Sequence, residues 1–196
     1  MIITRKFKNA FFEHLKGTST PILEFTHLAF LSKFQQPTKF DDLDTNNSEF
    51  TRVAISSSNI SYTDDILTIS INLATSDVVC PTSIITAQSG SLITLTSSTH
   101  SAFKLGDLIE IPTSSGYKEC IITAKNNTTY QITIDTPHGA TIGGTARLKV
   151  ANIAILCNST GTPAPSTDLI YSFIKNSFYK DSTATKQLTL KLNFIG

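Results

Sequence analysis

The sequence predicts a mainly β protein: a β-sandwich-like outer domain with one N-terminal helix, interrupted by a small β-barrel or meander. Short runs of alternating apolar and polar residues recur along the chain, and Gly, Asn, Asp, Pro or Ser bounds each of them. Threonine, a β-branched residue that suits a pleated surface, supplies 29 of the 196 residues. Only one stretch, close to the N-terminus, repeats its apolar residues with a helical period.

The predicted helix covers residues 4–16. Thr4 can cap its start, and Gly17 can end it. Its apolar and aromatic side chains fall on one stripe, which predicts that the helix packs against a sheet. The stripe comprises Phe7, Ala10, Phe11, Phe12, His14 and Leu15.

The outer domain is predicted to consist of residues 1–81 and 151–196. Its first strand, residues 22–31, is apolar on both alternating faces and should therefore be central in its sheet. Residues 32–47 contain few strand formers and are predicted to form a long surface loop. A strand over 49–56 follows this loop.

A hairpin closes the first half of the outer domain. Residues 59–62 are strand-like, the acidic pair Asp64-Asp65 makes the turn, and residues 66–73 return with one apolar and one polar face. After the insertion, residues 152–157 form an apolar run typical of a buried strand. A loop over 158–166, a strand over 169–174 and a long alternating strand over 186–195 complete the domain.

The insertion is predicted to span residues 82–150 and to hold its own hydrophobic core. Its strand-like runs are residues 83–86, 92–96, 103–112, 117–124, 130–135 and 146–150. Its predicted core residues are Ile93, Leu95, Leu108, Ile109, Ile111, Ile122, Ile132 and Ile134. We further expect the flanking strands 66–73 and 152–157 to pair with each other.

Composition limits the classes of partner. The net charge is +1 and charged residues make up 16% of the chain, so no basic surface for nucleic acid or an anionic membrane is expected. No apolar run follows the basic residues near the start, so a signal peptide is not predicted. No stretch approaches 18 apolar residues, so a membrane span is not predicted either. Cys80, Cys120 and Cys157 are predicted to be buried free thiols of a reducing compartment.

No catalytic, cofactor-binding or metal-binding residue is predicted, and the chain is not expected to be an enzyme. The four histidines, His14, His27, His100 and His138, lack the spacing of metal ligands. An acidic segment could offer carboxylates to calcium, but it lacks the glycine and terminal glutamate of an EF-hand, and a solvated loop is favoured: Asp41, Asp42 and Asp44. Residues 139–144 are glycine-rich, but they are followed by neither a Lys-Ser/Thr pair nor a helical pattern, so a phosphate-binding loop is not predicted.

Several segments of the outer domain resemble the N-terminal domain of bacteriophage tail-fibre and tail-collar proteins. The resemblance begins with Ile3-Thr4 before the helix and continues with the run Leu23-Glu24-Phe25-Thr26-His27-Leu28-Ala29. An acidic loop at 41–44, the hairpin, the strand at 152–156 and the alternating strand at 187–195 follow in the family's order. Phe30-Leu31-Ser32 stands where that family has a glycine, and Asn152 and Ala154 replace its glutamate and glycine. The inserted segment resembles small β-barrel insertions of phage tail and baseplate proteins, notably at 103–111.

This resemblance implies a structural virion protein of the phage tail: a fibre, fibre-adaptor or baseplate component. It would assemble in the bacterial host cytoplasm and act in the virion, as a trimer or ring of copies bound to other tail proteins. Three alternatives stay open: a head–tail connector or neck protein, a capsid decoration protein, and a glycan-binding module for receptor recognition. The absence of Trp and the five scattered Tyr residues count against the glycan module.

Overall fold

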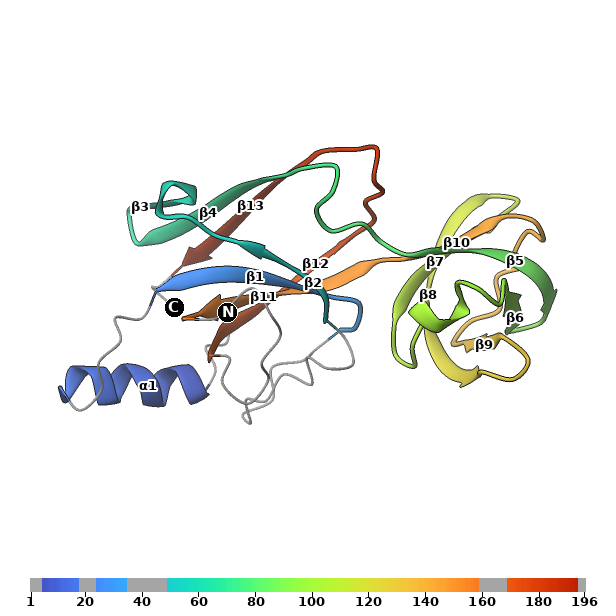
Figure 1. Cartoon of the computed structure of the whole chain (residues 1–196), viewed down its shortest axis with the longest axis horizontal. Helices are drawn as coiled ribbons and strands as arrows, with labels where there is room; N and C mark the ends of the chain where they lie inside the picture. The colour runs from blue at the N-terminus through green and yellow to red at the C-terminus, as the bar shows by residue number, and fades with distance from the viewer. Residues whose placement is uncertain (1–4, 18–23, 35–48, 159–168, 194–196) are drawn as a thin grey trace.

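The computed structural model describes residues 5–17, 24–34, 49–158 and 169–193. Figure 1 shows two sheets at one end of the molecule, a helix beside them, and a closed barrel at the other end. The predicted fold class, mainly β with an N-terminal helix and a small barrel, is confirmed. The predicted loop residues 35–47 and 159–166 and the predicted cap Thr4 lie outside the described residues.

The first sheet has four strands in the order β12-β11-β1-β2. β1 is central in this sheet, as the apolar character of both of its faces predicted. β11 is buried at all eight positions. β12 runs four residues beyond the predicted end at 174, because its ladder with β11 continues as far as the pair Val150 and Phe178. The bounds are β1 (Phe25–Leu31), β2 (Glu49–Ala54), β11 (Val150–Cys157) and β12 (Leu169–Phe178).

The second sheet has three strands in the order β13-β4-β3. The short helical turn η1 (Ser57–Asn59) leads into the predicted hairpin of β3 (Ile60–Thr63) and β4 (Ile66–Leu73). At its turn, Asp64 and Asp65 both have positive φ, 49° and 63°, as a two-residue hairpin turn requires. β13 (Lys186–Asn193) pairs with β4 over eight residues without a register shift.

The expected pairing of residues 66–73 with 152–157 is wrong, because β4 and β11 belong to different sheets. Both strands are instead fully paired elsewhere. β4 has one polar face and pairs with β13, which alternates in the same way; β11 is buried on both faces and lies between β1 and β12. Alternation specified the face of each strand but not its neighbour.

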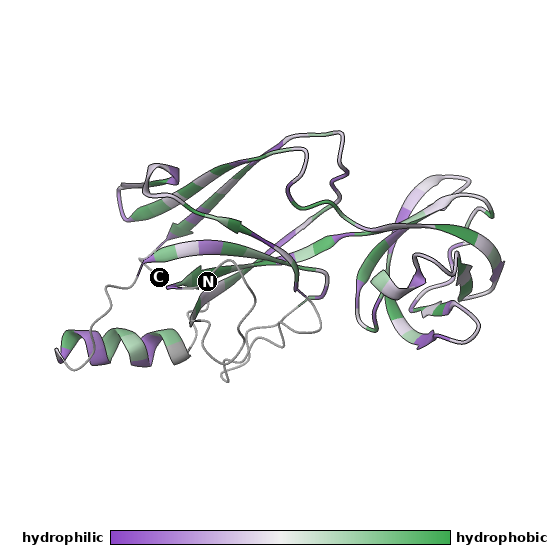
Figure 2. Cartoon of the chain, viewed as in Figure 1, coloured by the Kyte–Doolittle hydropathy of each residue, from purple (hydrophilic) through white to green (hydrophobic). Residues whose placement is uncertain are grey.

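The two sheets enclose one hydrophobic core. Each of its main strands contributes every second residue, as the alternation predicts. Figure 2 shows this alternation as green and purple segments along the strands of the three-stranded sheet. The core includes Leu28, Phe30, Ile69, Ile71, Leu73, Ile153, Ile155, Tyr171, Leu188, Leu190 and Leu192.

Six strands between residues 82 and 148 form the closed barrel, in the order β10-β5-β6-β9-β8-β7. All eight predicted core residues are buried, although Leu108 lies outside the cluster that fills the interior. A second short helical turn, η2 (His100–Ala102), precedes β7. The strands are β5 (Thr82–Ser89), β6 (Leu92–Leu95), β7 (Leu108–Thr113), β8 (Gly116–Asn126), β9 (Gln131–Ile134) and β10 (Thr145–Leu148).

The helix α1 (Arg5–Leu15) forms where predicted, but most of its aromatic stripe does not pack against the sheet. Phe7 meets Tyr171 edge-on, with ring centroids 4.8 Å apart. Phe11, Phe12 and Leu15 are 43%, 56% and 65% exposed, so the packing predicted for them is wrong. Among the described elements, the helix contacts mainly β12.

Candidate functional site

The junction between sandwich and barrel brings together several polar contacts of the described residues. The chain crosses it twice, through residues 74–81 and through Lys149, the one residue between β10 and β11. Sequence reasoning assigned none of these residues a role in a contact between the two parts. Phe50 on β2 contacts both hydrophobic cores, so the two parts share a packed boundary as well as polar contacts.

The first set of junction contacts joins the end of β1 to the start of β7. The backbone N–H of Leu108 donates to the carbonyl of Ser32 at 2.7 Å, and the Ser32 hydroxyl donates to Asp107 Oδ1 at 2.6 Å. The other oxygen of Asp107 accepts the N–H of Lys104 at 2.6 Å. Asp107 is fully buried, and this burial raises the pKa of its carboxyl group despite the hydrogen bonds.

The turn before Asp107 requires a glycine. Gly106 has a φ of +86°, a conformation that side chains with a Cβ rarely adopt. A Cβ at this position would also stand 3.3 Å from Cδ of Lys33, which belongs to the segment after β1. The backbone of the barrel therefore approaches the sandwich closely at this point.

The second set of contacts centres on Lys149. Its ammonium group donates to Glu110 Oε1 at 2.7 Å and to Glu119 Oε1 at 2.5 Å, and its side chain is only 8% exposed. Ser177 on β12 adds a hydrogen bond to Glu119 at 3.2 Å. Glu110 and Glu119 lie directly opposite each other in the β7–β8 ladder, where two like charges repel, and the lysine between them offsets this repulsion.

Ionisation at this cluster is coupled. The hydrogen bond from Lys149 lowers the pKa of Glu119 against the opposing effect of burial. Burial alone would lower the pKa of Lys149, but its hydrogen bonds to Glu110 and Glu119 outweigh burial and the pKa is raised. Both shifts favour the charged forms, so the cluster is an ion pair at neutral pH.

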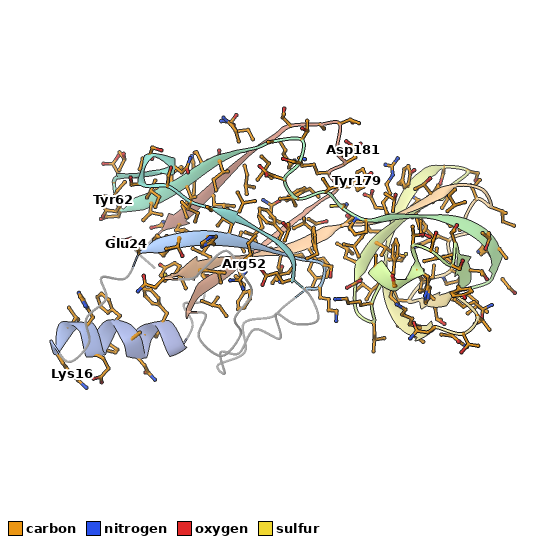
Figure 3. The ribbon with its side chains drawn as sticks, viewed as in Figure 1. Lys16, Glu24, Arg52, Tyr62, Tyr179 and Asp181 are labelled. Atoms are coloured by element: carbon orange, nitrogen blue, oxygen red, sulfur yellow. The ribbon has the colours of Figure 1, made fainter. Side chains whose placement is uncertain are left out.

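The third set of contacts is a cation–π stack. The Arg147 guanidinium of β10 lies 3.8 Å from the ring centre of Tyr117 on β8 and 4.7 Å from that of Tyr179. Tyr179 follows β12 and lies between sandwich and barrel (Figure 3). Arg147 thus connects the barrel to the segment that leaves the four-stranded sheet. Together, the three sets fix the orientation of the barrel on the sandwich.

The barrel surface away from the junction carries almost no charge. Residues 82–99, 126–134 and 136–146 contain no Lys, Arg, Asp or Glu, and much of the barrel has pale or green shades in Figure 2. Four charged residues of the barrel lie in the junction contacts just described. The others are Lys104, Lys118, Lys125 and Asp135, and the Lys125 ammonium is bound to the carbonyls of His100, Ser101 and Phe103.

Threonine hydroxyls on this uncharged surface donate hydrogen bonds to backbone carbonyls of the barrel itself. Thr86 donates to the carbonyl of Thr94 at 3.2 Å, and Thr96 donates to that of Ile84 at 3.3 Å. Thr123 on β8 donates to the carbonyl of a facing residue on β9 at 3.2 Å. The surface therefore offers methyl groups, oxygen lone pairs and the side chain of Ile84, which is 52% exposed. It is less polar than its composition suggests.

A small depression opens on the same surface, with a volume of about 290 Å³. Neither an aromatic nor a charged side chain lines it, and Thr99 and Ser83 within it are bonded to each other at 2.7 Å. Ligand sites are usually larger and lined by aromatic residues with a few convergent polar groups. Its lining is Thr82, Ser83, Ile84, Thr96, Ser98, Thr99 and Thr145.

The residues considered for chemistry from sequence lie apart from one another. His14, His27 and His100 are on α1, β1 and η2, and His138 is in the loop before β10. In the described part of the chain, no group of three or more His, Cys, Asp or Glu side chains could hold a metal ion. Burial lowers the pKa of His100. Asp41, Asp42 and Asp44 lie outside the described residues.

The three cysteines are buried and unpaired by disulfides, as predicted. Cys120 belongs to the barrel core, whereas Cys80 and Cys157 belong to the sandwich core. Burial raises the pKa of Cys120 and of Cys157 to about 12, so these thiols stay protonated and unreactive at neutral pH.

No protein-family model matches the chain, and neither does any curated protein or solved structure. Among the described residues, none of the helices combines the length and apolar character needed to cross a membrane.

Proposed function

We propose that this chain is a structural protein of a bacteriophage tail, a fibre, fibre-adaptor or baseplate component that works by assembling with copies of itself and with other tail proteins. The resemblance at residues 3–4, 23–29, 152–156 and 187–195 motivates the choice of a tail protein. The proposal places it in the virion as a trimer or ring, after assembly in the cytoplasm of the bacterial host.

The observation that carries this proposal is the barrel, which is fixed to the sandwich and has an uncharged outer surface. Protein interfaces are depleted of charged residues at their centres, because a buried charge without a partner is costly. A surface of threonine methyls and partly exposed Ile84 and Leu92 meets that condition. The fixed junction would hold this surface at a constant angle, as repeated copies in a particle require.

Particle composition and labelling provide the test. Phage particles carrying the gene are purified by density gradient, their proteins are identified by mass spectrometry, and gold-labelled antibody against this chain is located by electron microscopy. We expect several copies per particle and label confined to the tail. Label at the neck or on the capsid would support the connector or decoration alternatives, and absence of the chain from intact particles would refute a structural role.

A further inference from the structure

In the part of the chain that the structure describes, the two sheets of the sandwich have four edge strands, and β13 differs from the other three. An edge strand offers unpaired N–H and C=O groups to which another strand can bind, and natural proteins usually protect such edges. β3 has only four residues, and β12 has two register shifts in its ladder and is contacted by α1. At β2, the side chains of Glu49 and Arg52 form an ion pair, and the ladder with β1 has a register shift between Phe30 and Leu31, so that edge is irregular.

β13 is the long, regular edge of the described sandwich. It pairs with β4 through all eight residues without a bulge, and neither proline nor glycine interrupts it. Leu188, Leu190 and Leu192 are buried in the core, whereas Thr189 and Lys191 are exposed on the outer face. Lys191 lies on the outer face and Lys186 is the first residue of the strand, so no charged side chain points into the core from the strand's centre.

We propose that β13 pairs antiparallel with β13 of a second copy of this chain, which joins two three-stranded sheets into one six-stranded sheet. The inference rests on the proposed function in one respect, that copies of this chain associate. A two-fold axis perpendicular to the sheet keeps the inner faces of both copies on the same side. Residues opposite each other must then have the same parity, buried with buried and exposed with exposed.

The pattern of β13 selects one register. With the axis at Leu190, Leu188 lies opposite the partner's Leu192, and Thr189 lies opposite the partner's Lys191. The leucine layer is continuous and no lysine faces a lysine. An axis at Thr189 would set Lys186 opposite the partner's Leu192, and an axis at Lys191 would set two lysines opposite each other.

The second copy is the partner that this chemistry fits, because the same five residues, 188–192, satisfy both sides of the contact. Such an isologous contact closes on two copies and does not propagate into a fibre. A regular edge can therefore exist without polymerisation. Combined with a trimer or ring around a tail axis, a two-fold contact produces dihedral symmetry and an even number of copies.

Disulfide trapping tests the register directly, because it detects even a short-lived contact. Protein with Thr189→Cys is mixed with protein with Lys191→Cys under mild oxidation, and the native thiols are buried. Opposite residues lie within the Cα distance of a disulfide, whereas diagonal ones, as in either variant alone, lie at about 7–8 Å. The mixture should therefore cross-link faster than either variant by itself. The matched control is Ser61→Cys mixed with Thr63→Cys on the other edge, β3, where both residues are exposed.

Charge substitution at Thr189 supplies a second readout. Thr189→Glu places a carboxylate opposite the partner's Lys191 twice in each dimer, whereas Thr189→Lys opposes two pairs of lysines. Dimer affinity measured by sedimentation velocity should rise for the first variant and fall for the second, each by roughly 2- to 30-fold. Thermal unfolding of the dilute monomers controls for damage to the fold.

Selective cross-linking at 189 and 191 supports the pairing even where the wild-type dimer is too weak to sediment as such. The pairing is overturned if cross-linking at 189 and 191 is no faster than at 61 and 63. It is also overturned if the dimer affinity is the same for Thr189→Glu and Thr189→Lys. The solution experiments are independent of particle labelling. Absence of the chain from virions would refute the proposed function and leave the measured pairing intact.

Discussion

Replacing Lys149 by Met should destabilise the protein by about 1.5–4 kcal/mol. Methionine keeps the length and most of the volume of the lysine stem but cannot bind the two glutamates. Glu110, whose side chain is 18% exposed, then faces Glu119 across the β7–β8 ladder without a cation between them.

The magnitude follows from the exposure of each partner. The bond to Glu110 is largely buried, and hydrogen bonds to charged groups contribute about 1.5–3 kcal/mol in such settings. The Glu119 side chain is 51% exposed, so the second bond is screened by solvent and adds only about 0–1 kcal/mol.

Urea unfolding followed by far-UV circular dichroism measures the free energy of unfolding. The matched control is Lys118→Met, the same substitution at an exposed position on β8, which should change stability by less than about 0.5 kcal/mol. A double-mutant cycle with Glu110→Gln should give a coupling of about 0.5–3 kcal/mol. Equal costs for Lys149→Met and Lys118→Met, or a coupling of zero, would show that the ion pair does not hold the junction.

The cost of Lys149→Met should also depend on pH. Because Lys149 lowers the folded-state pKa of Glu119, the stabilisation from Glu119 is present above its unfolded pKa, about 4.3, and is lost as the pH falls through the folded pKa. The difference between wild type and variant should therefore shrink as the pH is lowered below about 4. A difference that stays constant across this range would contradict the assignment.

Three further outcomes are expected. Gly144→Ala should lower stability by about 1–3 kcal/mol in thermal unfolding, because the new Cβ would stand 2.5 Å from Cγ of Pro112; an unchanged melting temperature would contradict that contact. A thiol reagent at neutral pH should leave Cys120 and Cys157 unmodified in the native protein and react with both after denaturation, so stoichiometric native labelling would show that their burial is wrong. Replacing residues 82–148 by a Gly/Ser linker should leave the sandwich folded, with dispersed amide resonances, since no barrel residue belongs to the sandwich's buried core; an unfolded product would show that the junction is indispensable.

Sequence alone was sufficient where a strand's own alternation decides its burial. The buried face of β13 and the β3–β4 hairpin were both predictable, because Leu188, Leu190 and Leu192 repeat with period two and Asp64-Asp65 tolerates positive φ. The fold class followed from the same signals. These features depend on residues close together in the chain.

Features that depend on distant partners were not predictable. The second half of β12, Lys175-Asn176-Ser177, contains weak strand formers, and its ladder with β11 decides its conformation. Likewise, the helix pattern identified the apolar face of α1 but not how far the sheet extends beneath it. Phe7 reaches Tyr171, and Phe12, little more than one turn further on, is 56% exposed.

The junction left one signal in the sequence. Lys149 is the only charged residue in the apolar run from 148 to 157, which follows Arg147, and a buried lysine needs an anionic partner. The antiparallel β7–β8 ladder supplies that partner, because it sets Glu110 opposite Glu119, and a cation between these two carboxylates reduces their repulsion. Since the lysine lies where the chain returns to the sandwich, the hairpin face that bears the carboxylates has to meet the sandwich. The orientation of the barrel, and with it the position of its uncharged surface, therefore depends on a charge balance between two segments that sequence patterns treat as separate.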